Sequence, residues 1–218
     1  YQTSGFSFRF LNFFPSNTDS YTSYFPDKIL TVGDHFTKLL IDYGKYPIPI
    51  ETFAALRFDY KHENSKYIIN NASKIIYKRI LYAFSVHIGQ YASIVSDLID
   101  VFKNTEIEVH LKFHPLYEVK NIKIELPKNF KVWIDLDNCL LSEMYDVVLF
   151  NDNSFGIESL IQGVRSYEYD LNLVYDERRM IGFDLYDNKM NINKLPGLKN
   201  DLINNKLDKS LSKTQTQE

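Results

Sequence analysis

The sequence predicts an α/β fold built on a mostly parallel β-sheet with helices on both faces, preceded by a small N-terminal segment. Short apolar runs that suit strands alternate along the chain with amphipathic stretches that suit helices. Residues 147–150 are continuously apolar, as in a strand covered on both faces. A polar turn follows them directly and opens into another helical pattern. This strand–turn–helix order is typical of parallel sheets with crossover helices.

The first 60 residues carry a pattern of their own. We expect a strand over residues 27–32, then a helix that Asp34 caps and that buries one apolar face. Gly44 stands where this helix should end. A second short strand is expected over residues 52–57. The mixed polar stretch that follows, residues 59–74, suits a connector or an exposed helix.

A more regular alternation begins near residue 80. The expected strands are residues 80–86, 107–113, 130–134, 147–150 and 164–169. Helices are expected between them, and the first is marked by a buried stripe of Ile94, Val95, Leu98, Ile99 and Phe102. A short helix is expected over residues 137–144 and another after Ser154. Residues 175–207 suit helices and loops, and residues 208–218 a frayed polar tail.

Composition narrows the classes of function. The chain has 218 residues, a net charge of −3 and a single cysteine, Cys139. The lack of a basic surplus argues against nucleic acid as a partner. One cysteine allows no internal disulfide, and no cluster suggests a metal site, so we expect neither metal nor cofactor. No apolar run reaches about 18 residues, which excludes a membrane span by hydropathy. We expect a cytoplasmic protein, and a fragment, since it begins at Tyr1 rather than Met.

Asn151 to Ser154 form the turn that follows the most apolar strand. Asn and Ser side chains can cap the start of a helix, where free N–H groups and partial positive charge favour an anion, most often phosphate. Asn153, Ser154 and Gly156 are therefore candidate phosphate contacts. Glu158, one turn further on, could accept hydrogen bonds from sugar hydroxyls. The alternative is an ordinary strand–helix connection, in which Glu158 stabilises the helix dipole.

Two further turns follow strands and should reach the same edge of the sheet. His110, Lys112 and His114 share one face of their strand, and His114 is the last of them. Lys112 and His114 could pair with phosphate, or could belong to a solvated polar face. His87 and Gly89 follow the strand over residues 80–86, and Gly89 would let backbone approach a ligand closely. The alternative there is a tight turn.

Taken in order, the three turns resemble a known family. Ser85-Val-His-Ile-Gly89, Lys112-Phe-His-Pro115 and Asn153-Ser-Phe-Gly-Ile-Glu158 resemble the carboxyl-terminal half of GT-B glycosyltransferases that build bacterial capsule and surface polysaccharides. That resemblance implies a Rossmann-like domain over residues 61–207, with residues 1–60 the remnant of an acceptor-side domain and linker. It also implies that His114 and Ser154 hold the donor nucleotide and its phosphate.

The resemblance further implies a metal-independent enzyme that uses a nucleotide-activated sugar, with a glycan or a lipid-linked acceptor. The donor would be linked to CMP, UDP or GDP, since Asn153-Ser154 differs from the Ser-Ser or Ser-Thr of the CMP-using enzymes. Location at the inner membrane surface is a further option. The acceptor site and catalytic base would lie in the missing amino-terminal half, so the fragment alone could be inactive. Alternatives are a non-catalytic nucleotide-sugar-binding module and a nucleotide-sugar 2-epimerase-like enzyme.

Overall fold

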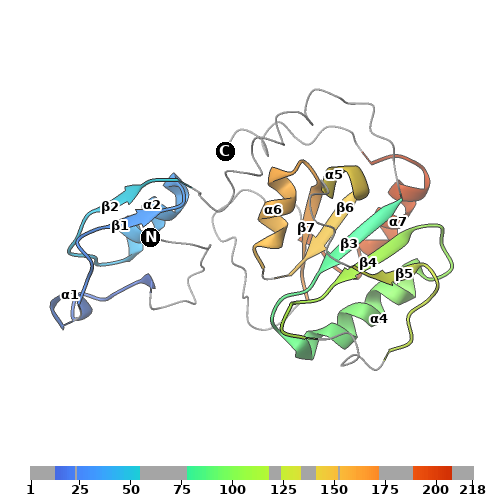
Figure 1. The fold of residues 1–218 in the computed structure, drawn as a ribbon, viewed down its shortest axis with the longest axis horizontal. Coiled ribbons are helices and arrows are strands. Elements are labelled where there is room, and N and C mark those ends of the chain that lie inside the picture. The colour runs from blue at the N-terminus through green and yellow to red at the C-terminus, as the bar shows by residue number, and fades with distance from the viewer. Residues whose placement is uncertain are drawn as a thin grey trace. The chain divides into compact units, whose positions relative to one another are not determined.

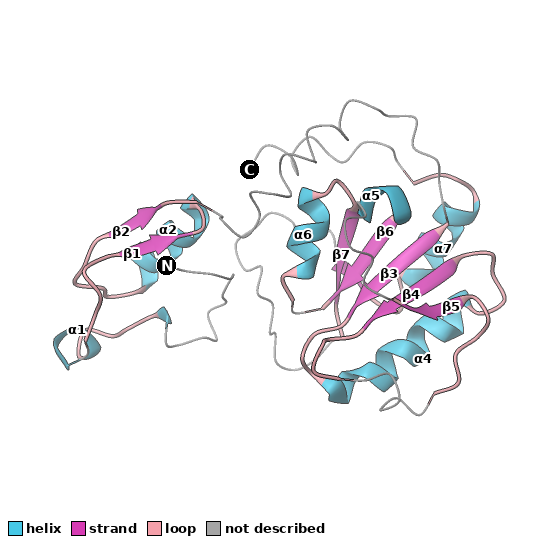
Figure 2. Ribbon diagram, in the orientation of Figure 1, coloured by secondary structure: helices cyan, strands magenta, loops and turns pink. Residues whose placement is uncertain are grey.

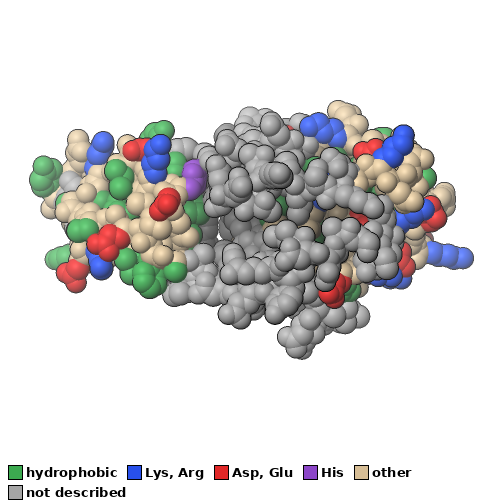
Figure 3. All heavy atoms as spheres, turned by 90° about the horizontal axis from the view of Figure 1, so that it is seen from above, with side chains coloured by type: hydrophobic (Ala, Val, Ile, Leu, Met, Phe, Trp, Pro, Cys, Tyr) green, Lys and Arg blue, Asp and Glu red, His purple; other side chains and the backbone are tan. Residues whose placement is uncertain are grey.

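The structure is a computed structural model of the 218-residue chain. It describes residues 13–22, 24–54, 78–117, 124–133, 141–151, 153–171 and 189–207. The chain divides into two compact units, one made of Tyr1–Tyr60 with Tyr175–Tyr186 and the other of Lys61–Val174 with Asp187–Glu218. Cys139, the connector of residues 59–74 and the tail of residues 208–218 lie outside the described residues. On the visible described surface, acidic and basic side chains are interspersed (Figure 3).

The smaller unit contains one strand–helix–strand motif. After a short helix α1 (Asp19–Thr22), strand β1 (Ile29–Thr31) leads into helix α2 (Asp34–Tyr43) and strand β2 (Ile50–Thr52). β1 and β2 pair in parallel, and the apolar face of α2 packs against them through Phe36 and Leu40. The predicted strand and helix are confirmed, but Asp34 does not cap the helix. Gly33 is at the N-cap position, Asp34 is the first helical residue, and no side chain makes a capping hydrogen bond there.

Two details of the smaller unit differ from the expectation. The second strand ends at Thr52 instead of beginning there, and residues 55–57 lie outside the described residues. Gly44 ends α2 in extended backbone, so left-handed geometry is not what favours glycine. A Cβ at Gly44 would lie 2.8 Å from the Leu40 carbonyl oxygen and from the Tyr46 ring, so close packing explains the residue.

The larger unit is built on a six-stranded sheet in which every neighbouring pair is parallel. The strands are β3 (Arg79–Ala83), β4 (Glu108–Lys112), β5 (Phe130–Val132), β6 (Val147–Phe150), β7 (Arg165–Tyr169) and β8 (Lys189–Met190). Their spatial order is β5-β4-β3-β6-β7-β8, and Figure 1 labels the first five of these strands. The chain thus moves outward from β3 on one side, returns to pair β6 with β3, and continues on the other side. This is the strand order of dinucleotide-binding sheets, and it reverses direction between β3 and β6.

Helices cover both faces of this sheet, as predicted (Figure 2). On one face lie α4 (Tyr91–Phe102), which follows the 3-10 turn η3 (Ile88–Gln90), and α7 (Leu195–Ile203). On the other face lie α5 (Leu141–Met144) and α6 (Phe155–Ile161). The fold is therefore a Rossmann-like α/β fold. Among the described residues, no helix is both long enough and apolar enough to cross a bilayer.

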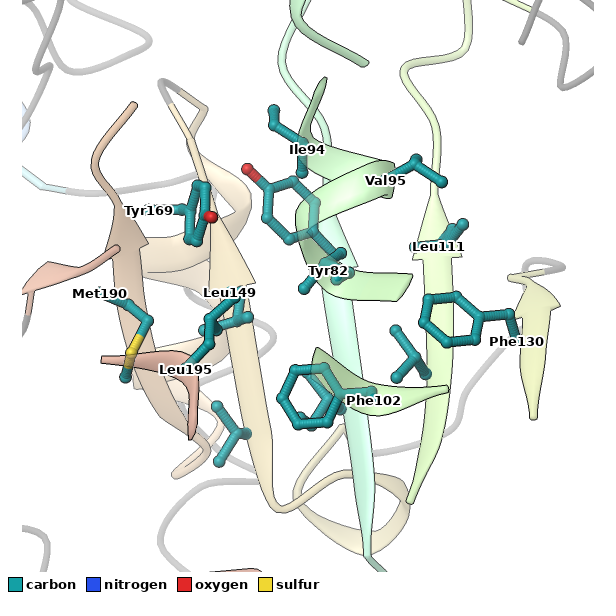
Figure 4. Close-up of a cluster of buried hydrophobic side chains, with 14 of the residues drawn as sticks. Tyr82, Ile94, Val95, Phe102, Leu111, Phe130, Leu149, Tyr169, Met190 and Leu195 are labelled. Atoms are coloured by element: carbon teal, nitrogen blue, oxygen red, sulfur yellow. The ribbon is translucent and has the colours of Figure 1, made fainter. Parts of the chain in front are cut away.

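The main core lies between the sheet and α4. Figure 4 shows Tyr82, Leu111 and Leu149 on their strands facing the helix that carries Ile94 and Val95. The stripe predicted for this helix is confirmed, because Ile94, Val95, Leu98 and Phe102 are buried and Ile99 packs half-buried against the same core. The Tyr169 hydroxyl donates to the Asp97 carboxylate at 2.9 Å. The neighbouring Tyr82 hydroxyl is fully buried and has no hydrogen-bonding partner among the described residues.

A cluster of charged side chains joins β3, β4 and β5 near the edge of the sheet where β3 and β4 begin. The Glu108 carboxylate accepts hydrogen bonds from Arg79 Nε at 2.8 Å and Lys131 Nζ at 2.6 Å. His110 Nδ1 lies 2.7 Å from the Tyr145 hydroxyl, and its Nε2 lies 3.6 Å from Glu108. Burial lowers the pKa of His110, which favours the neutral ring. His110 therefore belongs to this cluster and not to the carboxyl edge where His114 lies.

Candidate functional site

The three predicted turns meet at the carboxyl edge of the sheet, at the point where strand order reverses. Ala83 is in register with Lys112 on one side and Phe150 on the other, so β3, β4 and β6 end at the same level. The residues at and beyond the ends of these three strands therefore share one edge, which we call the rim: Ser85–Tyr91, Lys112–Tyr117, Asn151 and Asn153–Gly156. Open parallel sheets bind ligands at such a position.

Asn151 links the turn after β6 to the turn after β3. Its side chain is buried, with 5% of its surface exposed. Its Oδ1 accepts the Ser85 N–H at 3.3 Å, and its Nδ2 donates to Ser85 Oγ at 3.3 Å and to Gln90 Oε1 at 3.0 Å. Ser85 Oγ also accepts the His87 N–H at 3.2 Å. The two turns are therefore one hydrogen-bonded assembly.

Asn153 caps α6, in place of the Ser154 cap that the sequence suggested as one option. Its Oδ1 accepts the Phe155 N–H at 3.0 Å, and its Nδ2 donates to the Ala83 carbonyl oxygen at 2.8 Å. Ser154 makes no side-chain capping bond. Since α6 has only 7 residues and its first N–H is taken by Asn153, the helix start offers less to an anion than predicted. Asn153 thus holds the turn in place through its side chain, and Ser154 follows it without capping the helix.

His114 presents one ring nitrogen as a donor. Its Nδ1 accepts the Leu116 N–H at 3.3 Å, so the neutral ring carries its proton on Nε2. The neighbouring Tyr91 hydroxyl donates to the Ser85 carbonyl oxygen at 2.5 Å, and the Tyr91 ring packs against Phe113 and Tyr117, which flank His114. Burial raises the pKa of Tyr91 and outweighs the opposing effect of the His114 backbone, so the hydroxyl stays protonated. Tyr91 therefore ties the His114 turn to the Ser85 turn.

Lys112 brings positive charge to the face of the sheet that α6 covers. Its ammonium lies 3.8 Å from the centre of the Trp133 ring and 5.3 Å from that of Phe155. Aromatic faces attract cations, so the two rings hold the ammonium beside the start of α6. Phe155 follows Ser154 directly, which sets this charge close to the turn of residues 151–154.

Gly89 and Gly156 differ in what surrounds them. Among the described residues, no atom would lie within 4 Å of a Cβ at Gly89, so they leave the space above this backbone open. A Cβ at Gly156 would lie 2.4 Å from the Phe150 ring, which lies beneath it on β6. Gly156 is buried and lets α6 approach the sheet. The expected ligand contact at Gly156 is therefore better explained as helix–strand packing, while Gly89 keeps the expected open approach.

The remaining candidates are less open. Glu158 is in the first turn of α6, as predicted, but only 8% of its surface is exposed, so a sugar hydroxyl would have to displace what covers it. His87 is half-buried in the turn before η3. Ser85, Gln90, Tyr91 and Asn151 complete the rim. Ser85 and Asn151 belong to turns that the sequence singled out, but none of the four was expected to contact the ligand. Ser85 and Asn151 could have been found from the sequence, because each is a polar residue just after a central apolar strand.

No group of three or more His, Cys, Asp or Glu side chains among the described residues is arranged to hold a metal ion. The arrangement offers instead an imidazole N–H, a lysine ammonium, a serine hydroxyl and open backbone along one edge. These groups suit an anion that carries hydroxyls.

Comparisons with known proteins give a limited result. No protein-family model and no curated protein matches the chain. Among solved structures, the wall teichoic acid polymerase TagF is similar with a TM-score of 0.41 and 16% sequence identity. A variant of the same polymerase is similar with a TM-score of 0.40 and 14% identity. Both matches cover 88% of this chain and 50% of the other, so the chain spans about half the length of these structures.

Proposed function

We propose that the rim binds a nucleotide-activated sugar and that the chain is the donor-binding part of a glycosyltransferase. The observation that carries this proposal is the meeting of three turns along one rim at the reversal of strand order. Asn151 joins the β3 and β6 turns by hydrogen bonds, and the Tyr91 ring packs against the β4 turn. Binding of a nucleotide at such a position needs groups for phosphate and an open approach. His114, Lys112, Ser154 and Gly89 meet that requirement.

The reaction we propose is direct displacement at the anomeric carbon of the sugar. The bond from that carbon to the donor phosphate oxygen breaks, and a bond to an acceptor hydroxyl oxygen forms. Negative charge then builds on the leaving phosphate, where His114 Nε2–H and the Lys112 ammonium would stabilise it without a metal ion. The hydroxyl proton goes to a base that this chain does not identify. The acceptor and the pathway, surface polysaccharide synthesis, are part of the same proposal.

Isothermal titration of the chain with CMP, CDP, UDP and GDP tests the binding step. We expect heat of binding with at least one of them. A folded sample that gives none with any of the four refutes the proposal. Product analysis of the whole protein with the nucleotide-sugar that binds tests transfer itself.

Substitution of His114 tests its assigned role. His114→Ala removes the Nε2–H donor, and losing a hydrogen bond to a charged oxygen should raise Kd about tenfold or more. His114→Asn keeps an amide N–H donor and should lose less. If both variants bind like the unsubstituted chain, His114 does not contact the phosphate.

A further inference from the structure

The turn between β3 and α4 is fixed by one side chain that lies outside it. Ser85 begins this turn and Gln90 ends it, with His87 and Gly89 between them. The Asn151 amide bonds to both ends, to Ser85 through Oδ1 and Nδ2 and to Gln90 through Nδ2. His87 and Gly89, the two site candidates of this turn, therefore lie between two anchor points on a single amide.

Only one orientation of this amide fits its surroundings. The Ser85 backbone N–H is a donor and requires an oxygen at 3.3 Å, which fixes Oδ1 there. Nδ2 then faces two acceptors, Ser85 Oγ and Gln90 Oε1, and uses both of its hydrogens. An aspartate would have no hydrogen for either acceptor, and a leucine would leave the Ser85 N–H unpaired. Asparagine thus satisfies all three contacts as they stand, whereas aspartate would require Ser85 Oγ and Gln90 to turn their own donors toward it.

The amide itself rests on rigid structure. Asn151 follows β6 directly and is 5% exposed, and its carbonyl oxygen accepts Asn153 Nδ2 at 3.0 Å. Asn153 is in turn bonded to the Ala83 carbonyl oxygen. A side chain held in this way fixes the neighbouring turn relative to β6. Within a buried network, each such bond is costly to break, because the partner is left unsatisfied.

We propose that Asn151 is the positioning residue of the rim, holding the Ser85–Gln90 turn where His87 and Gly89 receive the ligand. This inference rests on the proposed nucleotide binding for its functional part. Its structural part, that Asn151 holds the turn, can be tested on the chain without any ligand.

Hydrogen exchange of the 218-residue chain without ligand tests the structural part. Asn151→Ala should speed exchange of the His87 amide, which Asn151 reaches only through Ser85 Oγ. The Tyr117 amide, bonded to the His114 carbonyl oxygen at 2.9 Å, is the internal reference and should keep its rate. An unchanged His87 rate in Asn151→Ala overturns the proposal, whether or not any nucleotide binds.

Titration with the nucleotide that binds best tests the functional part. Asn151→Ala should raise Kd about threefold to tenfold, in proportion to the loss of ordering hydrogen bonds. Tyr169→Phe removes a hydrogen bond to Asp97 that lies outside the Asn151 network, and it serves as the control for lowered stability. Equal Kd values for Asn151→Ala and Tyr169→Phe overturn the positioning role.

Gln90→Ala provides a milder variant if Asn151→Ala fails to fold. It removes only the bond from Asn151 Nδ2 to Gln90 Oε1 and leaves the Ser85 bonds in place. We expect faster exchange at His87 and a smaller rise in Kd, and no change in either measurement overturns the proposal. If the unsubstituted chain binds no nucleotide, the proposed function fails, and the exchange rates still decide whether Asn151 holds the turn.

Discussion

A methyl group added at Gly156 and one added at Gly89 should have opposite effects. At Gly156 the new Cβ would lie 2.4 Å from the Phe150 ring, whereas ordinary contact begins at 3.4 Å, so ring and helix must separate by 1.0 Å (3.4 − 2.4). Phe150 is buried, which blocks an easy retreat. Such overpacking costs about 1–3 kcal/mol, and the better helix propensity of alanine returns about 1 kcal/mol at most.

Gly156→Ala should therefore lower the free energy of unfolding by about 1–2 kcal/mol. For a chain of this size each kcal/mol lowers Tm by about 2–4 °C. Urea unfolding followed by circular dichroism measures the change. A Gly156→Ala variant as stable as the unsubstituted chain would contradict the close approach of α6 to β6.

Gly89→Ala should leave stability unchanged or raise it by about 0.4–1 kcal/mol, because its space is open and its φ is not positive. If a nucleotide approaches the backbone there, the methyl group takes the place of ligand atoms, and Kd should rise about tenfold. Gly197→Ala, at another open glycine on α7, is the matched control and should bind normally. An unchanged Kd for Gly89→Ala removes this glycine from the site.

Two further predictions concern the buried polar groups of the sheet. Tyr169→Phe removes a hydrogen bond to Asp97 and should cost about 1.5–3 kcal/mol. Tyr82→Phe removes a hydroxyl without a partner among the described residues and should cost less than about 1 kcal/mol, and equal losses in urea unfolding would contradict this contrast. Because burial lowers the pKa of His110 in the folded chain below the ordinary 6.5, the unfolded chain binds more protons, and stability should fall as pH drops below 6.5. Glu108 opposes this shift, while Lys131 and Arg79 add to it. His110→Gln should flatten the stability curve between about pH 5.5 and 7.5, and an unchanged slope would refute the assignment.

The central elements could be predicted because their signals are local. The stripe of α4 and the continuous apolar run of β6 each appear in a few consecutive residues. The alternation of buried and half-buried residues in β4 was equally visible. β8 has only 2 residues, too few for any period, and was missed inside a stretch expected to be helices and loops.

The details of the site depend on contacts between distant residues, so the sequence alone could not supply them. That the three turns share one edge followed from the parallel sheet, but the order of strands did not. Asn151 and Ser85 are 66 positions apart, and their pairing exists only once β6 lies beside β3. Gly156 carried an ambiguous signal, since glycine serves both ligand approach and close helix packing, and only the position of Phe150 separates the two.

Trp133 is the only tryptophan in the chain, and Lys112 lies over its ring. The indole emission therefore originates beside the rim, with no contribution from any other tryptophan. A bound anion that drew the ammonium away would alter the electric field at the indole, and with it the emission wavelength. Binding of an anion at the rim can therefore be followed through the fluorescence of Trp133, without an added label.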